Sequence, residues 1–544
     1  MNLAFVSYET PFAPCGGIAA VMGRLPAQVQ AAARQEAIVI APFHHRIEKM
    51  NALGRSHEGN FGIAFDGRTV MVNIYRHDKD VPFYFLLPDD QRLFAGQRHP
   101  YDVSAADLLR DALFFGSAVS RALHVIAPGQ RWNLLLQDWE SATAALALAD
   151  QPGTHRAFLT LHNSYDVGVS ANDLWRVGIN PNACPGETIL QRALAVSERP
   201  VFTVSEQFGF DFTEDVLQNR VMAPQLQEIL KPRLIGIDNG PFTDLAIDPE
   251  VVSDAVAGRT SRLREWKQTH RQAFLKALAA FEPGEERPLW GRLDLFDAGH
   301  APWFVMAGRD DARQKGYDVA AHAAGTFLDQ GGDARFLFFP IPGDEGHDGL
   351  AFLHKLAERF PQRVLVFPFL FREGFLSALR GADFGVMPSL YEPFGMANEF
   401  YLNGTIAIGR STGGLVQQIV PLRAAAAFSR SVQARAERWH ASSALPTGLL
   451  FREVDGMLSE ASDWSHINAG AYERGSNGLD RVQERSRYPL FRSMAFELKL
   501  AIEDGVRITK QPGLYYQMLT QGIAHIQQTF SWERAANEYL RHMV

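Results

Sequence analysis

The stretch that decides the fold runs from residue 382 to residue 415 and reads ADFGVMPSLYEPFGMANEFYLNGTIAIGRSTGGL. It holds two short apolar runs, Phe384–Met387 and Thr405–Ile408, and each is followed by a loop rich in Gly, Pro or Ser. Continuous apolar runs of this length are typical of strands buried on both faces, as in parallel sheets. After the second strand the pair Gly413-Gly414 precedes an apolar segment that suits a helix. The stretch therefore predicts strand–loop–helix units.

The same pattern extends outward in both directions. Strands alternating with helical segments indicate βαβ units and an α/β fold. The further runs that we expect to be strands are Leu3–Tyr8, Ala37–Ala41, Val70–Tyr75, Phe83–Leu87, Leu134–Gln137, Phe158–Leu161, Val201–Val204, Leu234–Ile237, Trp303–Ala307, Arg335–Phe339 and Val364–Phe367.

The expected strands fall into two groups, separated by an irregular region. Residues 242–301 hold one strong helical segment, Ser261–Phe281, and a charged Gly/Pro loop at 282–288. We predict an N-terminal Rossmann-like domain over 1–241, a linker region over 242–301, and a second Rossmann-like domain over 302–527. The apolar stripe of Trp532, Ala535, Ala536 and Tyr539 predicts a last helix within 528–544. Two such domains are expected to face each other across a cleft, with ligands at the carboxyl ends of strands.

Composition excludes several classes of protein. The chain has 544 residues, 46% apolar and 21% charged, with a formal net charge of -8, which fits a globular protein and argues against nucleic-acid binding. The two cysteines make no disulfide framework or zinc motif. The apolar N-terminal run ends at Glu9, too soon for a signal peptide, and no stretch is long enough to span a membrane. A cytoplasmic location is expected, and oligomerisation stays open.

Two glycine pairs follow strands. Gly16 and Gly17 follow the first strand, and Thr412, Gly413 and Gly414 follow the strand Thr405–Ile408. Glycines where a helix begins let the backbone approach an anion such as a diphosphate. Each pair also fits a plain tight turn.

Charged residues follow two further strands of the second half. Arg309 and Lys315 follow Trp303–Ala307 and could neutralise a departing diphosphate, although a solvated basic loop fits the spacing equally well. Glu392 follows Phe384–Met387, where a carboxylate could hold sugar hydroxyls and stabilise positive charge on the reacting carbon. A surface carboxylate is the alternative. Gly395 is expected at the start of the next helix.

Polar residues follow two strands of the first half. Residues 137–140 read QDWE and residues 161–163 read LHN, which places Asp138 and His162 at strand ends. A single histidine is more often a hydrogen-bonding structural residue than a catalyst, and its position beside Asn163 raises the functional odds only slightly.

These motifs together resemble the glycogen/starch synthase family of retaining glycosyltransferases, whose B-type fold has two Rossmann-like domains. The family carries A-D-x-x-x-M-P-S-x-x-E-P-C-G, then Y-G-T, then R-T-G-G-L, which this chain matches in order between residues 382 and 415. Supporting matches are Thr203–Ser205, Asp238–Gly240, Gln314–Gly316 and the segment around Phe530–Trp532. In the family this last helix returns to the N-terminal domain.

The resemblance implies a role for each matching residue. Arg309 and Lys315 would hold the donor diphosphate. Glycines 16, 17, 413 and 414, with Thr412, would bind phosphate or sugar through backbone N–H groups. As implied catalytic residues, Glu392 would contact the donor sugar, His162 would lie beside the reacting carbon, and Asp138 would orient the acceptor or the histidine. No metal or cofactor is implied, and the departing phosphate oxygen takes the acceptor proton.

The chain departs from the family pattern at several positions. The lysine of the family's K-x-G-G-L is Pro14 here, a loss of about 2–3 kcal/mol of phosphate stabilisation. The family's H-D-W-H becomes QDWE, so both histidines are replaced, by Gln137 and Glu140. The spacing from Arg309 to Lys315 is one residue longer, E-P-C-G becomes E-P-F-G, and Glu399 lies near but not at the family's second glutamate position.

The resemblance implies an enzyme, a hexosyltransferase that moves a hexose, with glucose from ADP- or UDP-glucose as the first candidate, to a hydroxyl acceptor. Two alternatives stay open. One is transfer to an acceptor other than glucan, and the other is a catalytically impaired relative that binds glucan or nucleotide sugar. The expected partners are a nucleotide-sugar donor and a carbohydrate or other hydroxyl acceptor.

Overall fold

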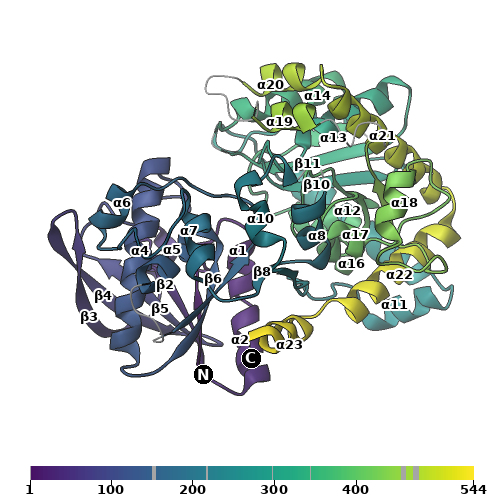
Figure 1. Ribbon diagram of the computed structural model, residues 1–544. Coiled ribbons are helices and arrows are strands. Elements are labelled where there is room, and N and C mark those ends of the chain that lie inside the picture. Colours follow the sequence, from purple (N-terminus) through teal and green to yellow (C-terminus); the bar gives the residue numbers. More distant parts are fainter. Residues whose placement is uncertain are drawn as a thin grey trace. The chain divides into compact units, whose positions relative to one another are not determined.

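The computed structural model describes residues 2–149, 155–215, 219–296, 298–343, 345–454, 461–469 and 477–543. The chain divides into two compact units (Figure 1). The N-terminal unit comprises Met1–Thr213, Met222–Phe242 and Phe530–Val544, and the C-terminal unit comprises Glu214–Val221 and Thr243–Thr529. The region 242–301 therefore groups almost entirely with the C-terminal unit.

The N-terminal unit is built on a nine-stranded sheet of order β3-β4-β5-β2-β1-β6-β7-β8-β9. The pairs β3/β4 and β4/β5 are antiparallel and the other pairs are parallel. The strands are β1 (Asn2–Val6), β2 (Ala37–Pro42), β3 (Ser56–Phe65), β4 (Arg68–Asp78), β5 (Pro82–Pro88), β6 (Trp132–Gln137), β7 (Arg156–Leu161), β8 (Val201–Thr203) and β9 (Leu234–Gly236).

The burial of these strands explains why the sequence predicted most of them. Every residue of β2 and β6 is buried, so both strands appear in the sequence as unbroken apolar runs. The strand β3 was missed because its outer half is exposed and carries His, Glu, Gly and Asn, which leaves no apolar run to detect. It forms a hairpin with β4 at one edge of the sheet.

Helices cover the N-terminal sheet. Ser104 caps the longest helix, α4, by accepting a hydrogen bond from the Asp107 backbone N–H at 3.1 Å. The helix α4 packs on α5, and α5 packs on α7. The helices are α1 (Gly17–Met22), α2 (Leu25–Ala33), α3 (Glu48–Asn51), α4 (Ala105–Ile126), α5 (Asp138–Leu148), α6 (Ala171–Arg176), α7 (Ile189–Val196), α8 (Glu206–Glu214), η1 (Pro224–Leu226), α10 (Gln227–Leu230) and α23 (Trp532–Met543).

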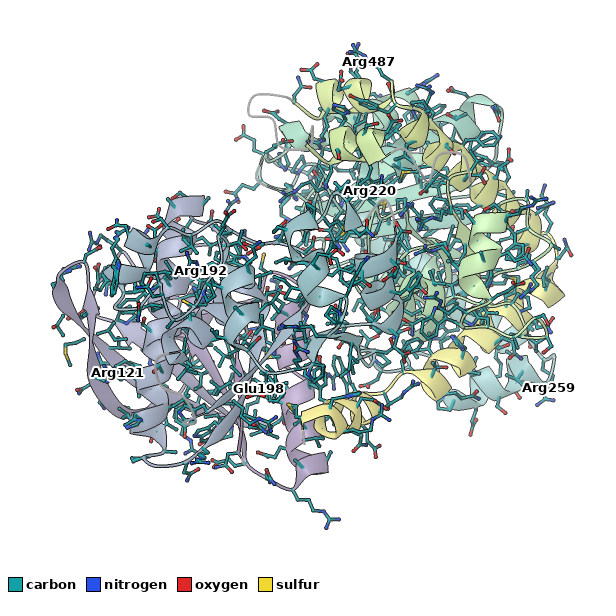
Figure 2. All side chains as sticks on the ribbon, viewed as in Figure 1. Arg121, Arg192, Glu198, Arg220, Arg259 and Arg487 are labelled. Atoms are coloured by element: carbon teal, nitrogen blue, oxygen red, sulfur yellow. The ribbon has the colours of Figure 1, made fainter. Side chains whose placement is uncertain are left out.

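The last helix, α23, packs against α2 of the N-terminal unit, as the sequence predicted (Figure 1). Its Trp532 donates an indole hydrogen bond to the Pro241 carbonyl at 2.7 Å. A Cβ at Gly240 would lie 2.5 Å from the Trp532 backbone nitrogen, so only glycine allows this approach. At the other end of α23, Arg156 donates to the Met543 carbonyl at 3.0 Å and lies 3.7 Å from Glu198, which Figure 2 labels.

The C-terminal unit contains a six-stranded parallel sheet of order β12-β11-β10-β13-β14-β15. Its strands are β10 (Trp303–Arg309), β11 (Arg335–Ile341), β12 (Val364–Val366), β13 (Phe384–Met387), β14 (Ile406–Arg410) and β15 (Leu449–Phe451). Only β15, three residues long, was not predicted from the sequence.

The helices of this unit pack in pairs and on the sheet, with α13 against both α14 and α21, α12 against α15, and α16 against α22. They are α11 (Pro249–Val256), α12 (Ser261–Ala279), α13 (Tyr317–Asp329), η2 (Asp348–Leu350), α14 (Ala351–Arg359), α15 (Phe375–Gly381), α16 (Ala397–Leu402), α17 (Leu415–Gln418), α18 (Arg430–Ala436), α19 (Ala461–Ala469), α20 (Gly478–Arg485), α21 (Pro489–Thr509) and α22 (Pro512–Thr529).

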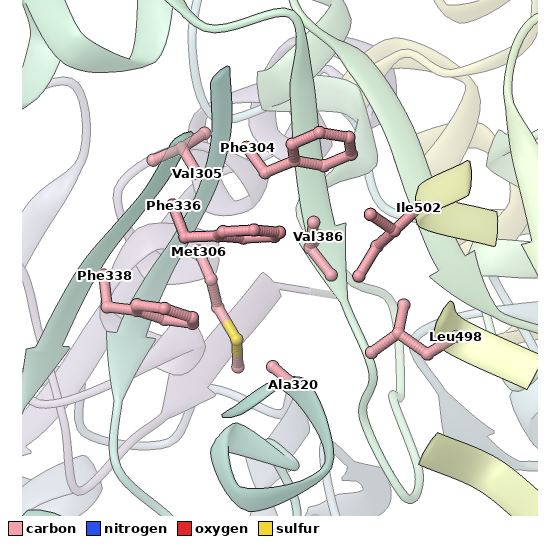
Figure 3. A pocket seen from close by; sticks show the side chains of 9 residues that line it. All are labelled: Phe304, Val305, Met306, Ala320, Phe336, Phe338, Val386, Leu498 and Ile502. Carbon is pink, nitrogen blue, oxygen red and sulfur yellow. The ribbon is translucent and has the colours of Figure 1, made fainter. Parts of the chain in front are cut away.

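A small apolar cavity lies inside this unit, between the sheet, α13 and α21 (Figure 3). Its volume of about 10 Å³ corresponds to the space that one water molecule needs, but no polar side chain lines it. The walls are Phe304, Val305, Met306, Ala320, Phe336, Phe338, Val386, Leu498 and Ile502. It is a packing defect of the core rather than a ligand site.

Strand order places the candidate site in each unit. In the N-terminal sheet the chain winds to one side of β1 through β2 and to the other side through β6, so the order reverses between β1 and β6. The same reversal occurs between β10 and β13 in the C-terminal sheet. Loops at such switch points diverge at the carboxyl edge and leave room for a ligand. Most of the predicted site residues follow these four strands, whereas His162 and residues 412–414 follow the adjacent strands β7 and β14.

Candidate active site

The loop after β1 carries Glu9, whose carboxylate occupies the backbone N–H groups of the glycine loop. Its Oε1 accepts hydrogen bonds from the N–H groups of Cys15, at 2.8 Å, of Ala19, at 3.2 Å, and of Gly16. Of these groups, the sequence assigned the Gly16 N–H, together with that of Gly17, to a diphosphate. The Gly16 N–H already has an anionic partner in this structure, so a phosphate at this group would compete with Glu9. The space around Gly17 is open, because a Cβ there would meet no atom within 4 Å.

The loop after β6 holds Asp138 in a left-handed backbone conformation, with φ +58°. A non-glycine residue in this region costs about 1–3 kcal/mol, and such residues concentrate at functional sites. The conformation aims the carboxylate at the end of β7. There Oδ1 accepts from the His162 backbone N–H at 2.6 Å and Oδ2 accepts from the Asn163 side chain at 2.7 Å. Asp138 and His162, predicted separately, therefore form one hydrogen-bonded unit.

Gln137 fixes the tautomer of His162. The Gln137 amide nitrogen donates to the Leu135 carbonyl at 3.0 Å, which turns its oxygen toward His162 Nε2 at 2.8 Å. An amide oxygen only accepts, so His162 Nε2 carries the proton and Nδ1 carries the lone pair. Burial lowers the pKa of His162 to about 3, so the ring is neutral at pH 7.

Two further buried acidic side chains, Glu9 and Glu140, lie near Asp138. Burial raises the pKa of Asp138 to about 7; the charge of Glu9 adds to the increase, while the hydrogen bonds from His162 and Asn163 oppose it. Burial, then the charges of Asp138 and Glu9, raise the pKa of Glu140 well above its ordinary value. Tyr101 lies against the same cluster and donates to Glu9 Oε2 at 3.3 Å. Glu140 therefore holds a proton more readily than an ordinary carboxyl group does.

In the C-terminal unit the structure brings Lys315 and Glu392 together. Lys315 Nζ lies 2.8 Å from Glu392 Oε2, and the Ser389 hydroxyl donates to the same oxygen at 2.8 Å. The Glu392 side chain is 6% exposed and that of Lys315 is 25% exposed, so the pair is partly shielded from water. Glu392 is not the surface carboxylate that the sequence left as the alternative.

The glycines of the 411–414 loop permit a close approach to Glu392. A Cβ at Gly413, whose φ is +49°, would lie 1.6 Å from the Glu392 carbonyl oxygen, and one at Gly414 would lie 2.2 Å from the Phe394 oxygen. The Gly414 N–H donates to the Glu392 carbonyl at 3.3 Å, and the Thr412 N–H donates to the Arg410 carbonyl at 2.8 Å. Both N–H groups have partners within the chain, so the first role of the glycine pair here is steric.

Arg309 and Gly395 complete the set of predicted residues. Arg309 ends β10, and its guanidinium lies 3.8 Å from Asp311, with 43% of the side chain exposed. This fits the expected cation at a strand end and also its alternative, a solvated loop with an acidic partner. Gly395, with φ +91°, lies two residues before α16, and a Cβ there would be 2.6 Å from Leu415 Cδ2. Gly395 thus joins the loop after β13 to the start of α17.

Sequence reasoning missed a buried ionic network that contacts the loops after β13 and β14. Arg410 donates a hydrogen bond to each carboxylate oxygen of Glu453, and the bond from Nε to Oε2 is 2.8 Å long. The Glu453 carboxylate also lies 3.6 Å from the Arg452 guanidinium. Arg410 also donates to the Leu390 carbonyl at 2.7 Å, and Arg452 donates to the Ser411 carbonyl. All three side chains are at most 1% exposed. Burial, the largest single influence, raises the pKa of Glu453, but Arg410 and Arg452 together outweigh it and hold the pKa below its ordinary value.

None of the three side chains belongs to a matched motif position, since Arg410 lies one residue before Ser411, which stands where the family's R-T-G-G-L has its arginine. Glu453 lies beyond β15, in a segment without a motif. Within the described part of the chain, no group of three or more His, Cys, Asp or Glu side chains has a geometry suited to a metal ion. No described helix is long and apolar enough to cross a membrane.

Comparisons with known proteins agree with this arrangement. Residues 2–208 match the starch synthase catalytic domain, and residues 251–404 match the family 4 glycosyltransferases of conflict systems. A glycogen synthase of Kosmotoga olearia is 26% identical over 443 residues, which cover 76% of this chain and 83% of that protein. A glycogen synthase of Xanthomonas axonopodis is 26% identical over 436 residues, covering 76% and 84%.

Solved structures show the same fold. The catalytic domain of starch synthase IV from Arabidopsis thaliana, bound to ADP and acarbose, superposes with a TM-score of 0.63 at 17% identity and covers 95% of this chain and 99% of its own. A sucrose-phosphate synthase from Thermosynechococcus elongatus gives a TM-score of 0.51 at 16% identity, with 99% and 98% covered. The two matched families are both glycosyltransferase families, and the chain shares the B-type fold of the solved starch synthase, with two α/β units.

Proposed function

We propose that this protein transfers a hexose, glucose in the first instance, from an ADP- or UDP-linked donor to a hydroxyl acceptor with retention at the anomeric carbon. The observation that carries the proposal is the Lys315–Glu392–Ser389 cluster at the switch point of the C-terminal sheet. It places one cation and one fixed carboxylate side by side. A donor with a diphosphate next to a sugar needs both groups.

The donor phosphates are assigned to Arg309 and Lys315. Their charges offset the negative charge that grows on the diphosphate as the bond to the sugar breaks, an electrostatic contribution of several kcal/mol in a shielded site. Glu392 accepts hydrogen bonds from sugar hydroxyls, and its charge favours the positive anomeric carbon. The solved starch synthase IV is bound to ADP, and its fold is shared by this chain, which supports a nucleotide-sugar donor.

The hydrogen-bonded pair Asp138 and His162, in the N-terminal unit, is assigned to binding the acceptor. Neutral His162 binds a sugar hydroxyl without adding charge, and Asp138 fixes the backbone that carries it. The departing phosphate oxygen takes the acceptor proton, so no side chain has to act as a strong base.

A second candidate is transfer to an acceptor other than α-glucan. The specific observation is that Gln137 and Glu140 stand where the family has histidines, and that both side chains are buried here. Gln137 is used to orient His162, and Glu140 adds a buried carboxyl group whose pKa is raised by burial. This chemistry favours a polar acceptor different from the end of a glucan chain.

The test is a screen of purified protein against ADP-, UDP- and GDP-hexoses, with and without glycogen or maltooligosaccharide. Elongation of the glucan supports synthase activity, and donor hydrolysis without elongation supports the second candidate. Glu392→Gln is expected to lower turnover about 10²–10³-fold, while Glu373→Gln, on the surface of the same unit, leaves it unchanged. If no nucleotide sugar is bound or hydrolysed, the enzyme proposal is wrong and the impaired relative takes its place.

A further inference from the structure

A surface hollow in the N-terminal unit is lined by basic side chains that the proposed reaction does not use. Its volume is about 360 Å³, within the range of small-molecule sites. The walls are Arg199, Pro200, Lys231, Pro232, Arg233, Leu234, Ile235 and His542. Four of the eight are Arg, Lys or His residues, and none is acidic.

The hollow lies at the opposite edge of the sheet from the pair Asp138 and His162. Arg199 lies two residues before β8 and Arg233 directly before β9, and these strands are parallel, with Val201 beside Leu234. The hollow is therefore at the amino ends of β8 and β9. Asp138 and His162 follow the carboxyl ends of β6 and β7. A ligand in the hollow would not touch the proposed catalytic groups.

The cations of the hollow lack acidic partners. Among the described residues, Arg199, Lys231 and Arg233 form no ion pair. Neighbouring acids are already engaged: Glu198 lies 3.7 Å from Arg156, and Glu538 pairs with Arg541 and lies 3.9 Å from His542.

Arg233 in particular is held in place with part of its guanidinium unused. It donates to the Leu194 carbonyl at 2.6 Å, while its Nε is buried without a hydrogen-bond partner among the described residues. Burial, and then the charge of Arg199, lower the pKa of Arg233. The two guanidinium groups therefore repel each other across the hollow. An anion between them would offset this repulsion and would accept a hydrogen bond from the unpaired Nε of Arg233.

We propose that this hollow is a binding site for an organic phosphate monoester. The phosphate lies among Arg199, Lys231 and Arg233, because two guanidinium groups and an ammonium suit a dianion with several acceptor oxygens. The organic part lies on the floor of Pro200, Pro232, Leu234 and Ile235, which offers apolar contact and no further charge. The site is separate from the donor diphosphate site in the C-terminal unit.

The experiment is isothermal titration of the full chain with phenyl phosphate, inorganic phosphate and phenol. Phenyl phosphate is expected to bind more tightly than inorganic phosphate, and phenol is expected not to bind. The Arg199→Ala/Lys231→Ala double variant is expected to weaken phenyl phosphate binding at least tenfold. Both side chains are exposed and make no side-chain hydrogen bond among the described residues, so the fold is expected to survive.

Two control variants make the outcome specific. Arg121→Ala removes an exposed arginine from α4, away from Glu198 on the same unit (Figure 2), and is expected to leave the affinity unchanged. Arg309→Ala/Lys315→Ala removes the proposed donor-phosphate cations and is also expected to leave it unchanged. Undetectable binding at millimolar concentration, equal affinity in the double variant, or equal affinity for phenyl phosphate and inorganic phosphate would each overturn the proposal. None of these results depends on whether the protein transfers a hexose.

Discussion

Replacing Glu453 with Gln tests whether the buried network supports the candidate donor site. Glu453 is the only carboxylate that pairs with Arg410 among the described residues, whereas Arg452 also pairs with Asp215 at 2.8 Å. The substitution keeps the size of the side chain and removes its charge. Among the described residues, Arg410 then has no paired carboxylate and keeps only neutral contacts: the amide oxygen that replaces Glu453, the Leu390 carbonyl, and stacking over Trp464 at 5.3 Å.

The expected loss of stability follows from the cost of an unpaired buried charge. Removing one partner of a buried ion pair costs about 3–5 kcal/mol. Because Arg452 keeps Asp215, we expect the lower end, about 3 kcal/mol of unfolding free energy for the C-terminal unit. Transfer activity is expected to fall as well, since Arg410 and Arg452 hold the Leu390 and Ser411 carbonyls of the two loops around Glu392.

The assay is guanidinium chloride unfolding followed by tryptophan fluorescence, with each unfolding transition fitted separately. The matched control is Glu437→Gln, which removes an exposed partner of Arg423 at 3.3 Å and is expected to leave the transition unchanged. The double variant Arg410→Met/Glu453→Leu is expected to recover most of the loss, because an apolar pair leaves no buried charge. A loss below about 1 kcal/mol for Glu453→Gln would refute the reasoning, since an unpaired buried guanidinium cannot cost so little.

Further predictions concern the catalytic loops and the core. Because the pKa of Asp138 is about 7 in the folded protein, the folded state keeps a proton that the unfolded chain loses near pH 4, so unfolding free energy is expected to fall as pH rises between these values, by up to about 1.4 kcal/mol per unit. Chemical denaturation at several pH values measures this pH dependence. If the unfolding free energies of the wild type and of Asp138→Asn change with pH in the same way, the prediction is contradicted. Gly413→Ala forces a Cβ to 1.6 Å from the Glu392 carbonyl oxygen. The control is Gly331→Ala, since Gly331 also has a positive φ but a Cβ there meets no atom within 4 Å. Gly413→Ala is expected to lower the unfolding free energy by more than about 2 kcal/mol beyond the control, and equal denaturation midpoints for the two variants would exclude the clash. Val386→Ile adds one methyl group toward the apolar cavity and is expected to raise unfolding free energy by about 0.5–1 kcal/mol, whereas a loss in thermal unfolding would show that the cavity cannot take it.

Most of the fold was predictable because burial imposes a simple pattern on a parallel strand. β2 and β6 are buried along their whole length, so the sequence shows them as apolar runs without reference to any neighbour. The exposed edge strand β3 has no apolar run, so pairing with its neighbour rather than burial defines it. The strand β15 is apolar and fully buried, but its three residues are too few to stand out in the sequence.

The candidate site divides in the same way. The sequence by itself determined which residue types follow which strands, and hence that Asp138 and His162, or Lys315 and Glu392, belong to loops at carboxyl strand ends. Strand order cannot be read from local patterns, so only the tertiary structure decided that these loops lie at the switch points.

Only the tertiary structure could also decide how the groups are paired. Glu9 reaches the Gly16 N–H across seven residues, and Glu453 reaches Arg410 across 43. Hydrogen bonds and charge pairs depend on distances of a few ångströms, and those distances exist only once the strands and loops are packed. The sequence therefore determined which functional groups lie at each strand end. The packing of the chain decided which of those groups pair with each other and which can bind a ligand.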